Sequence, residues 1–166
     1  MQTLHNNRGF TLIEMLVVVA IIAILSLIAL PSAEPTVARK QVLESLDLIE
    51  DYKKAVAVYF KATLSFPKDN VEAGIPKPEF LIGNYVDRIE LHQGAFHIYF
   101  GSKTHPALKD KILTIRPIVV KSSPESPMSW ICGYSAIPDG MQAASADKTT
   151  VDQKFLPFSC RMMSTK

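Results

Sequence analysis

The most constraining feature of the sequence is an apolar segment near the amino terminus. Between Met15 and Leu30 the only polar side chain is Ser26. Counted from Phe10, the segment has about 20 residues, and a helix of that length spans about 30 Å, the thickness of the hydrocarbon core of a bilayer. A secretory signal peptide has a shorter apolar core followed by a cleavage site of small residues. We therefore predict a retained transmembrane helix over residues 10–31.

The rest of the chain has the composition of an ordinary soluble domain. The chain has 166 residues and a formal charge of +2, which on bulk charge gives no case for a nucleic-acid-binding protein. Its two cysteines, Cys132 and Cys160, are too far apart for a CxxC redox or zinc motif. Two thiols in a domain outside the cytosol most often form a disulfide, and two unpaired buried thiols are the alternative.

The orientation of the predicted span depends on these cysteines. Arg8 precedes the apolar segment and Arg39 and Lys40 follow it, so the count of basic residues on the two sides is nearly equal. A disulfide requires an oxidising compartment. We therefore expect the amino terminus in the cytoplasm and the bulk of the chain on the opposite side of the membrane.

A single carboxylate, Glu14, lies near the start of the apolar segment. A carboxylate at the bilayer centre costs roughly 2–3 kcal/mol on insertion scales and usually has a partner. In the first turn of a helix it can instead reach the headgroups and interact favourably with the helix dipole. No cationic side chain follows Glu14 within the segment. Cleavage after Gly9 would supply a cation, because the new amine of Phe10 would lie one turn away or face the Glu14 of a neighbouring copy.

The stretch RGFTLIEMLVVVAIIAIL resembles the amino terminus of type IV pilins, and more closely the type IVa prepilins. That family has a short basic leader ending in Gly, followed by Phe-Thr-Leu-Ile-Glu and an apolar helix. The resemblance implies that residues 1–9 are a leader and that prepilin peptidase cuts after Gly9 and methylates the amine of Phe10. It also implies that Glu14 neutralises the Phe amine of an adjacent subunit, and that Pro31 kinks the helix.

The chain after the apolar segment has the pattern of an amphipathic helix, which we predict over residues 32–62. Apolar side chains recur at steps of three and four residues, at Val42, Leu46, Ile49, Val56 and Tyr59 or Phe60. The acidic residues opposite them fit a solvated helix face better than a metal site. Pro31 and Pro35 interrupt the junction with the apolar segment. Pro35 departs from the family pattern and predicts local unwinding between Ala29 and Thr36.

Residues 66–80 contain three prolines and have no apolar period, so we predict a loop there. After this loop the sequence changes to an alternating pattern of apolar and polar residues. The runs around Ile89 and Leu91, Phe96 to Phe100, KILTIRPIVV and SWICGY predict about four antiparallel strands packed on the amphipathic helix, with a tight turn at HQGA. Pro117 predicts an edge position or a bulge in its strand. The predicted fold is therefore α+β, with a β-sheet head over residues 63–166.

The end of the chain extends the resemblance to pilins. In that family a disulfide-bounded loop ends in a Pro and a Cys close together, and FLPFSC places Pro157 and Cys160 in that relation. The resemblance therefore implies a disulfide between Cys132 and Cys160 that closes a carboxyl-terminal loop.

The sequence contains no motif that indicates catalysis. It has no glycine-rich phosphate loop, HExxH or GxSxG. His92 and His97 face each other across the predicted hairpin turn, but no third metal ligand accompanies them. We predict a protein that is not an enzyme and that needs no cofactor and no metal.

The resemblance implies a structural subunit that polymerises into a type IV pilus after leader cleavage and N-methylation. Its partners would be other copies of the chain, prepilin peptidase and the inner-membrane assembly machinery. The subunit would begin as a single-pass protein of the bacterial inner membrane and end in an extracellular filament, with cell adhesion and twitching motility among the roles of such filaments. A minor pilin and a type II secretion pseudopilin share the leader, Phe10 and Glu14, although paired carboxyl-terminal cysteines favour a pilin.

A DNA-binding competence pilin is a further alternative. The densest basic interval of the chain consists of Lys103, Lys109, Lys111, Arg116 and Lys121. If the fold gathered these side chains on one face, they would form a site for phosphates. An ordinary solubilising distribution of charge is the simpler interpretation.

Overall fold

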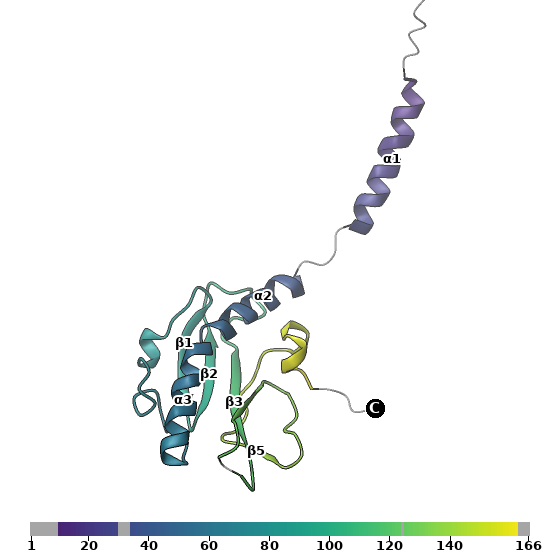
Figure 1. Ribbon diagram of the computed structural model, residues 1–166. Helices are drawn as coiled ribbons and strands as arrows, with labels where there is room; N and C mark the ends of the chain where they lie inside the picture. Colours follow the sequence, from purple (N-terminus) through teal and green to yellow (C-terminus); the bar gives the residue numbers. More distant parts are fainter. Residues whose placement is uncertain (1–9, 30–33, 124, 163–166) are drawn as a thin grey trace, which may run out of the picture. The chain divides into compact units, whose positions relative to one another are not determined.

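The structure is a computed structural model that describes residues 10–29, 34–123 and 125–162 (Figure 1). The chain divides into two units, Met1–Ala33 and Glu34–Lys166, and we call the second the head unit. In the first unit, helix α1 (Leu12–Ala29) occupies most of the predicted range 10–31. None of the helices in the described ranges combines the length and the apolar character needed to cross a membrane. Gly9 and Pro31 lie outside the described residues.

The predicted amphipathic helix over 32–62 is two helices, α2 (Glu34–Asp47) and α3 (Glu50–Thr63). A turn separates them, in which the Ile49 N–H donates to the carbonyl oxygen of Leu46 at 3.2 Å. Ile49 is fully buried, so the turn lets one side chain enter the core from between the two helices. The helical pattern on both sides of the turn is what made the sequence look continuous.

The predicted unwinding up to Thr36 is wrong for residues 34–36, which belong to α2. Pro35 is the second residue of that helix. In the first turn an N–H has no intrahelical acceptor, and the fixed φ of proline suits a helix start. Pro35 therefore begins a helix instead of unwinding one. Residues 30–33, the remainder of the predicted weak point, lie outside the described residues.

Five strands form one antiparallel sheet in the order β1-β2-β3-β4, with β5 also paired to β3. They are β1 (Val86–His92), β2 (Ala95–Phe100), β3 (Ile112–Val120), β4 (Ser129–Cys132) and β5 (Met141–Ala143). The four predicted strands are confirmed, and β5 is a short addition. Gln93 and Gly94, with φ values of 47° and 80°, make the predicted tight turn between β1 and β2.

Pro117 lies within β3, at a gap between the two strands that pair with one side of β3. The pairing of β3 with β2 ends at Ile115, and its pairing with β5 begins at Ile118. The Pro117 carbonyl accepts a hydrogen bond from the Ala144 N–H at 3.1 Å on that side. Because the proline falls between two partners, its missing N–H breaks no ladder hydrogen bond. The predicted edge position is wrong for the strand, because β3 pairs with β2 and β5 on one side and with β4 on the other, where Pro117 faces Trp130.

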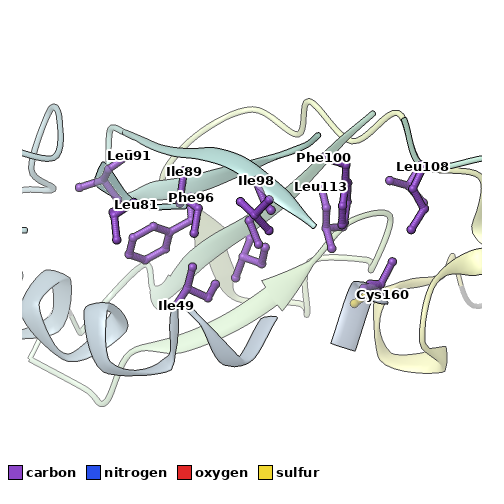
Figure 2. Packing of buried hydrophobic residues seen from close by; sticks show 14 of the residues in the cluster. Ile49, Leu81, Ile89, Leu91, Phe96, Ile98, Phe100, Leu108, Leu113 and Cys160 are labelled. Carbon is purple, nitrogen blue, oxygen red and sulfur yellow. The ribbon is translucent and has the colours of Figure 1, made fainter. Parts of the chain in front are cut away.

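The core of the head unit lies between the helices and one face of the sheet. Figure 2 shows Ile49 pointing from the helical segment toward Phe96 and Ile98, all three of them fully buried. Each large apolar side chain buried in this way contributes about 1.5–3 kcal/mol relative to an exposed one. Cys160 belongs to the same cluster, so the carboxyl-terminal segment is part of the core. Two 3-10 helices, η2 (Gln153–Phe155) and η3 (Phe158–Cys160), hold that segment in place.

Candidate functional site

The start of α1 contains a reciprocal pair of hydrogen bonds between Thr11 and Glu14. The Thr11 N–H and hydroxyl donate to Glu14 Oε2 at 2.8 and 2.9 Å, and the Glu14 N–H donates to Thr11 Oγ1 at 3.3 Å. α1 begins at Leu12, so Thr11 is the N-cap residue and Glu14 is the third helical residue. This arrangement is a capping box, which satisfies backbone N–H groups that a helix start leaves without acceptors.

The capping box leaves the charge of Glu14 without a cationic partner in its own helix. No Lys, Arg or His occurs between Phe10 and Ala29. The hydrogen bonds described for the carboxylate all go to one oxygen, Oε2. The second oxygen is therefore available to a donor from outside α1. Phe10, which carries the predicted new amine, is 80% exposed and immediately precedes the capping residue.

The large apolar side chains of α1 are exposed on every side of the helix over the described stretch from Leu12 to Leu25. Their exposure ranges from 47% at Met15 to 83% at Leu12. The one polar side chain in the middle of the helix, Ser26, donates its hydroxyl to the carbonyl oxygen of Ile22 at 2.7 Å, so it needs no external partner. A helix that is apolar all round requires an apolar environment, either other protein or lipid.

The carboxyl-terminal loop is closed by a disulfide between Cys132 and Cys160, as predicted. Cys132 ends β4 and Cys160 ends η3, and the Tyr134 N–H donates to the Cys160 carbonyl oxygen at 3.0 Å. Gly133 has a φ of +51°, and a Cβ there would lie 2.9 Å from that same oxygen. Glycine is therefore required for the close approach of β4 and the carboxyl-terminal segment.

His92 and His97 are neighbours, with ring centroids 6.4 Å apart. No group of three or more His, Cys, Asp or Glu residues that could hold a metal occurs among the residues that the structure describes. His97 is fully buried, and its Nδ1 lies 3.0 Å from Thr114 Oγ1. Burial lowers the pKa of His97 from 6.5 to about 4, so the ring is neutral and serves the packing of the sheet.

The structure does not bring the basic interval 103–121 together in one patch. Lys103, Lys109 and Lys111 precede β3 and Lys121 follows it. A strand of that length separates its two ends by about 30 Å. Arg116 lies in β3 and uses one guanidinium nitrogen, Nη2, to donate to the Gly133 carbonyl oxygen at 3.4 Å. This arrangement does not support the gathering on one face that the DNA-binding alternative requires.

The sequence analysis did not predict the structural roles of two residues, Thr11 and Arg39. Thr11 was not singled out, although a Thr three residues before a Glu at the start of an apolar run is the spacing of a capping box. Arg39 was used only in a charge count. In the structure its Nη2 donates to the Lys154 carbonyl oxygen at 3.0 Å, a contact between residues 115 positions apart that no local pattern indicates.

Comparison with known proteins follows the same division of the chain. The prokaryotic N-terminal methylation motif matches residues 4–30, and the family described as pilin (bacterial filament) matches residues 38–161. A fimbrial protein of Neisseria meningitidis serogroup B is 32% identical over 164 residues, which cover 93% of this chain and 94% of that protein. The type IV major pilin protein PilE1 of Neisseria gonorrhoeae is 34% identical over 159 residues, with coverage of 93% and 94%. Fimbrial protein EcpC of Eikenella corrodens is 31% identical over 160 residues, with coverage of 96% and 94%. The chain therefore belongs to the type IV pilin family and is a structural pilin subunit.

Proposed function

We propose that this subunit is the major component of its filament and that it assembles through the start of α1. Cleavage between Gly9 and Phe10, followed by methylation of the Phe10 amine, leaves a cation one residue before the capping box. The observation that carries the proposal is a carboxylate with no cation in its own helix, placed at the start of a helix whose large apolar side chains are exposed over the described stretch from Leu12 to Leu25. Its role is structural and not enzymatic.

Before assembly, residues 10–31 hold the subunit in the bacterial inner membrane, with the amino terminus in the cytoplasm and the head unit on the other side. Prepilin peptidase and the assembly machinery act on it there, and the finished filament is extracellular. The apolar environment that α1 requires is then lipid in the first state and neighbouring copies of α1 in the second. Because lipid tails are as apolar as leucine, the transfer gains little from the hydrophobic effect.

Polar contacts must therefore decide how the helices align. In a medium of low dielectric constant, a carboxylate without a counter-charge is costly, and a cation nearby relieves that cost. The Glu14 oxygen that the capping box leaves available accepts from the Phe10 amine of an adjacent subunit. Since each copy carries one amine and one carboxylate in a fixed relation, this pairing sets the register of the bundle.

The test is the Glu14→Gln variant. Glutamine is the other residue that completes a capping box, so this variant keeps the helix start and removes only the charge. We expect Glu14→Gln subunits to be cleaved and folded normally but to form at least tenfold fewer filaments, counted in sheared surface preparations. Ser26→Ala is the control, because that hydroxyl bonds within its own helix. A normal number of Glu14→Gln filaments would show that the pairing idea is wrong.

Intact-mass analysis of sheared wild-type filaments decides whether the subunit is major or minor. A main component that begins at N-methyl-Phe10, with a mass two hydrogens below the reduced value for the single disulfide, supports a major pilin. If filaments form while this chain is rare in them but processed in the membrane, it is a minor pilin or a pseudopilin instead.

A further inference from the structure

Three basic side chains from distant parts of the sequence converge at the beginning of α2. Arg39 and Arg161 both direct Nη2 at the carbonyl oxygen of Lys154, at 3.0 and 3.5 Å, and Arg161 Nε donates to the Leu156 carbonyl oxygen at 2.9 Å. Two guanidinium groups therefore lie side by side, next to the residue that carries the third cation. We call Arg39, Lys154 and Arg161 the cationic patch.

The positive charge of the cationic patch is not balanced within the head unit. Lys154 Nζ lies 3.5 Å from Asp152 Oδ2, but no carboxylate among the described side chains pairs with Arg39 or Arg161. Peptide oxygens carry only a partial negative charge. Within the described residues both arginines bond only to peptide oxygens, and the Lys154 side chain is 64% exposed. The net positive charge would therefore stabilise an anion bound at this surface.

Exposed apolar side chains flank the cationic patch. Phe158 is 73% exposed and Met162 is 63% exposed, and they lie on either side of Arg161 in the sequence. The Arg161 N–H donates to the Phe158 carbonyl oxygen at 3.2 Å, which keeps this segment compact. Cations beside exposed phenylalanine and methionine are the combination found on surfaces that bind anionic membranes, where the apolar groups enter the boundary between headgroups and tails.

The position of Arg39 in the sequence links the cationic patch to the proposed membrane segment. Arg39 follows residue 31, where that segment ends, by eight positions. In proteins anchored by a transmembrane helix, basic residues this soon after the span are within reach of anionic headgroups.

We propose that the cationic patch binds the phosphate groups of anionic phospholipids and rests the head unit on the membrane before assembly. This inference rests on the proposed function, because it requires α1 to be inserted in a bilayer. The adjacent Phe158 and Met162 favour a lipid surface over the carboxylates of a neighbouring subunit. A lipid surface offers phosphates to the cations and acyl chains to the apolar side chains, whereas carboxylates would pair with the cations alone.

The experiment uses the full chain in nanodiscs of phosphatidylcholine, with and without phosphatidylglycerol. Hydrogen–deuterium exchange is measured by mass spectrometry over residues 34–41 and 152–162. We expect exchange in both segments to slow several-fold when phosphatidylglycerol is present, and the difference to disappear at high salt, because salt screens exposed charges. The triple variant Arg39→Gln, Lys154→Gln, Arg161→Gln should lose the difference, and Phe158→Ser should reduce it.

The matched control removes the same charge elsewhere, as Lys103→Gln, Lys109→Gln, Lys111→Gln, and should keep the difference. Equal exchange in the two kinds of nanodisc overturns the proposal, and so does an equal loss in the control variant. If the patch variant stops filament assembly while lipid composition never affects exchange, the patch binds a neighbouring subunit, which also overturns it. Filament assembly by the wild type tests the proposed function separately, since filaments can form whether or not exchange depends on phosphatidylglycerol.

Discussion

Helix α1 and the head unit contain similar apolar side chains, but they differ in where that apolar surface goes. In α1, Leu12 is 83% and Ile24 is 61% exposed, whereas Phe96 and Ile98 in the head unit are fully buried. The head unit is complete within one chain, because its helices cover one face of its own sheet. The described apolar side chains of α1 are exposed, so under the proposed function they pack against lipid or against other copies of the chain. Substitutions should therefore affect head stability in one region and assembly in the other.

The largest effect on stability is expected from Phe96→Ala. Phe96 is fully buried, and its ring lies 5.7 Å from that of Trp130 between centroids. Removing a buried phenylalanine side chain costs about 3–5 kcal/mol, because the cavity collapses only partly. Thermal unfolding of the full chain in detergent, followed by near-ultraviolet circular dichroism, should show a large fall in Tm. Ile22→Ala in α1 is the comparison and should leave the head transition unchanged; a similar fall there would contradict the separation of the two regions.

A slightly smaller loss is expected when the disulfide is removed in the Cys132→Ser, Cys160→Ser variant. The bridged residues are 28 positions apart, and closing a loop of that length contributes about 3–4 kcal/mol in the chain-entropy model. Urea unfolding of the head unit within the full chain measures the loss. Leader cleavage should continue, because it concerns residues at the other end of the chain. Unchanged stability of the double variant would mean that the hydrogen bonds around Cys160 hold the segment without the bridge.

A pH-dependent loss of stability is expected from His97. Burial is the main cause that lowers its pKa to about 4, and the charges of Lys148 and His92 lower it further, while Glu90 and Asp147 act in the opposite direction. Because the unfolded ring titrates near pH 6.5, the unfolded state binds the proton more readily. The contribution of His97 is therefore present above pH 6.5 and is lost as the pH falls toward 4, at up to about 1.4 kcal/mol per pH unit.

Unfolding midpoints of the wild type and of His97→Gln across that pH range test this prediction. Glutamine keeps a polar partner for Thr114 Oγ1 but does not titrate, so the comparison isolates His97 from the carboxylates. The variant should show a shallower dependence on pH between 6.5 and 4. Parallel curves for the two proteins would show that His97 does not sense the pH.

The smallest effect is expected at the start of α1, from Thr11→Ala. Loss of an N-cap typically costs about 1 kcal/mol, which corresponds to about fivefold faster amide exchange in the first turn of α1. Exchange measured in detergent micelles should show this change over the first turn of α1 and none in β1 to β4. Filament number should change far less than in Glu14→Gln, since the carboxylate remains. A Thr11→Ala loss as large as that of Glu14→Gln would mean that the cap, and not the charge, controls assembly.

The parts of the fold that follow from local pattern were predictable. The alternation of Phe96, Ile98 and Phe100 with polar residues gave β2, and the turn at Gln93 and Gly94 joins it to β1 as expected. The division of the amphipathic helix at Ile49 was not predictable. The apolar period continues through the turn. Only the packing of Ile49 in the core with Phe96 and Ile98 shows why the helix is interrupted there. Pro35 was misjudged for a related reason, because a proline that ends one helix and a proline that begins another look alike in sequence.

The amino-acid sequence by itself determined the functional end of this protein. The N-terminal methylation motif over residues 4–30 and the proposed roles of Gly9, Phe10 and Glu14 depend on local spacing along the chain, and local spacing is visible in sequence. Only the tertiary structure decided which distant residues meet. In the sheet, His97 lies against Thr114, and at the carboxyl-terminal segment Arg39 meets Lys154 and Arg161. Such contacts depend on how the sheet, the helices and the closed loop pack together, and packing is a property of the whole fold.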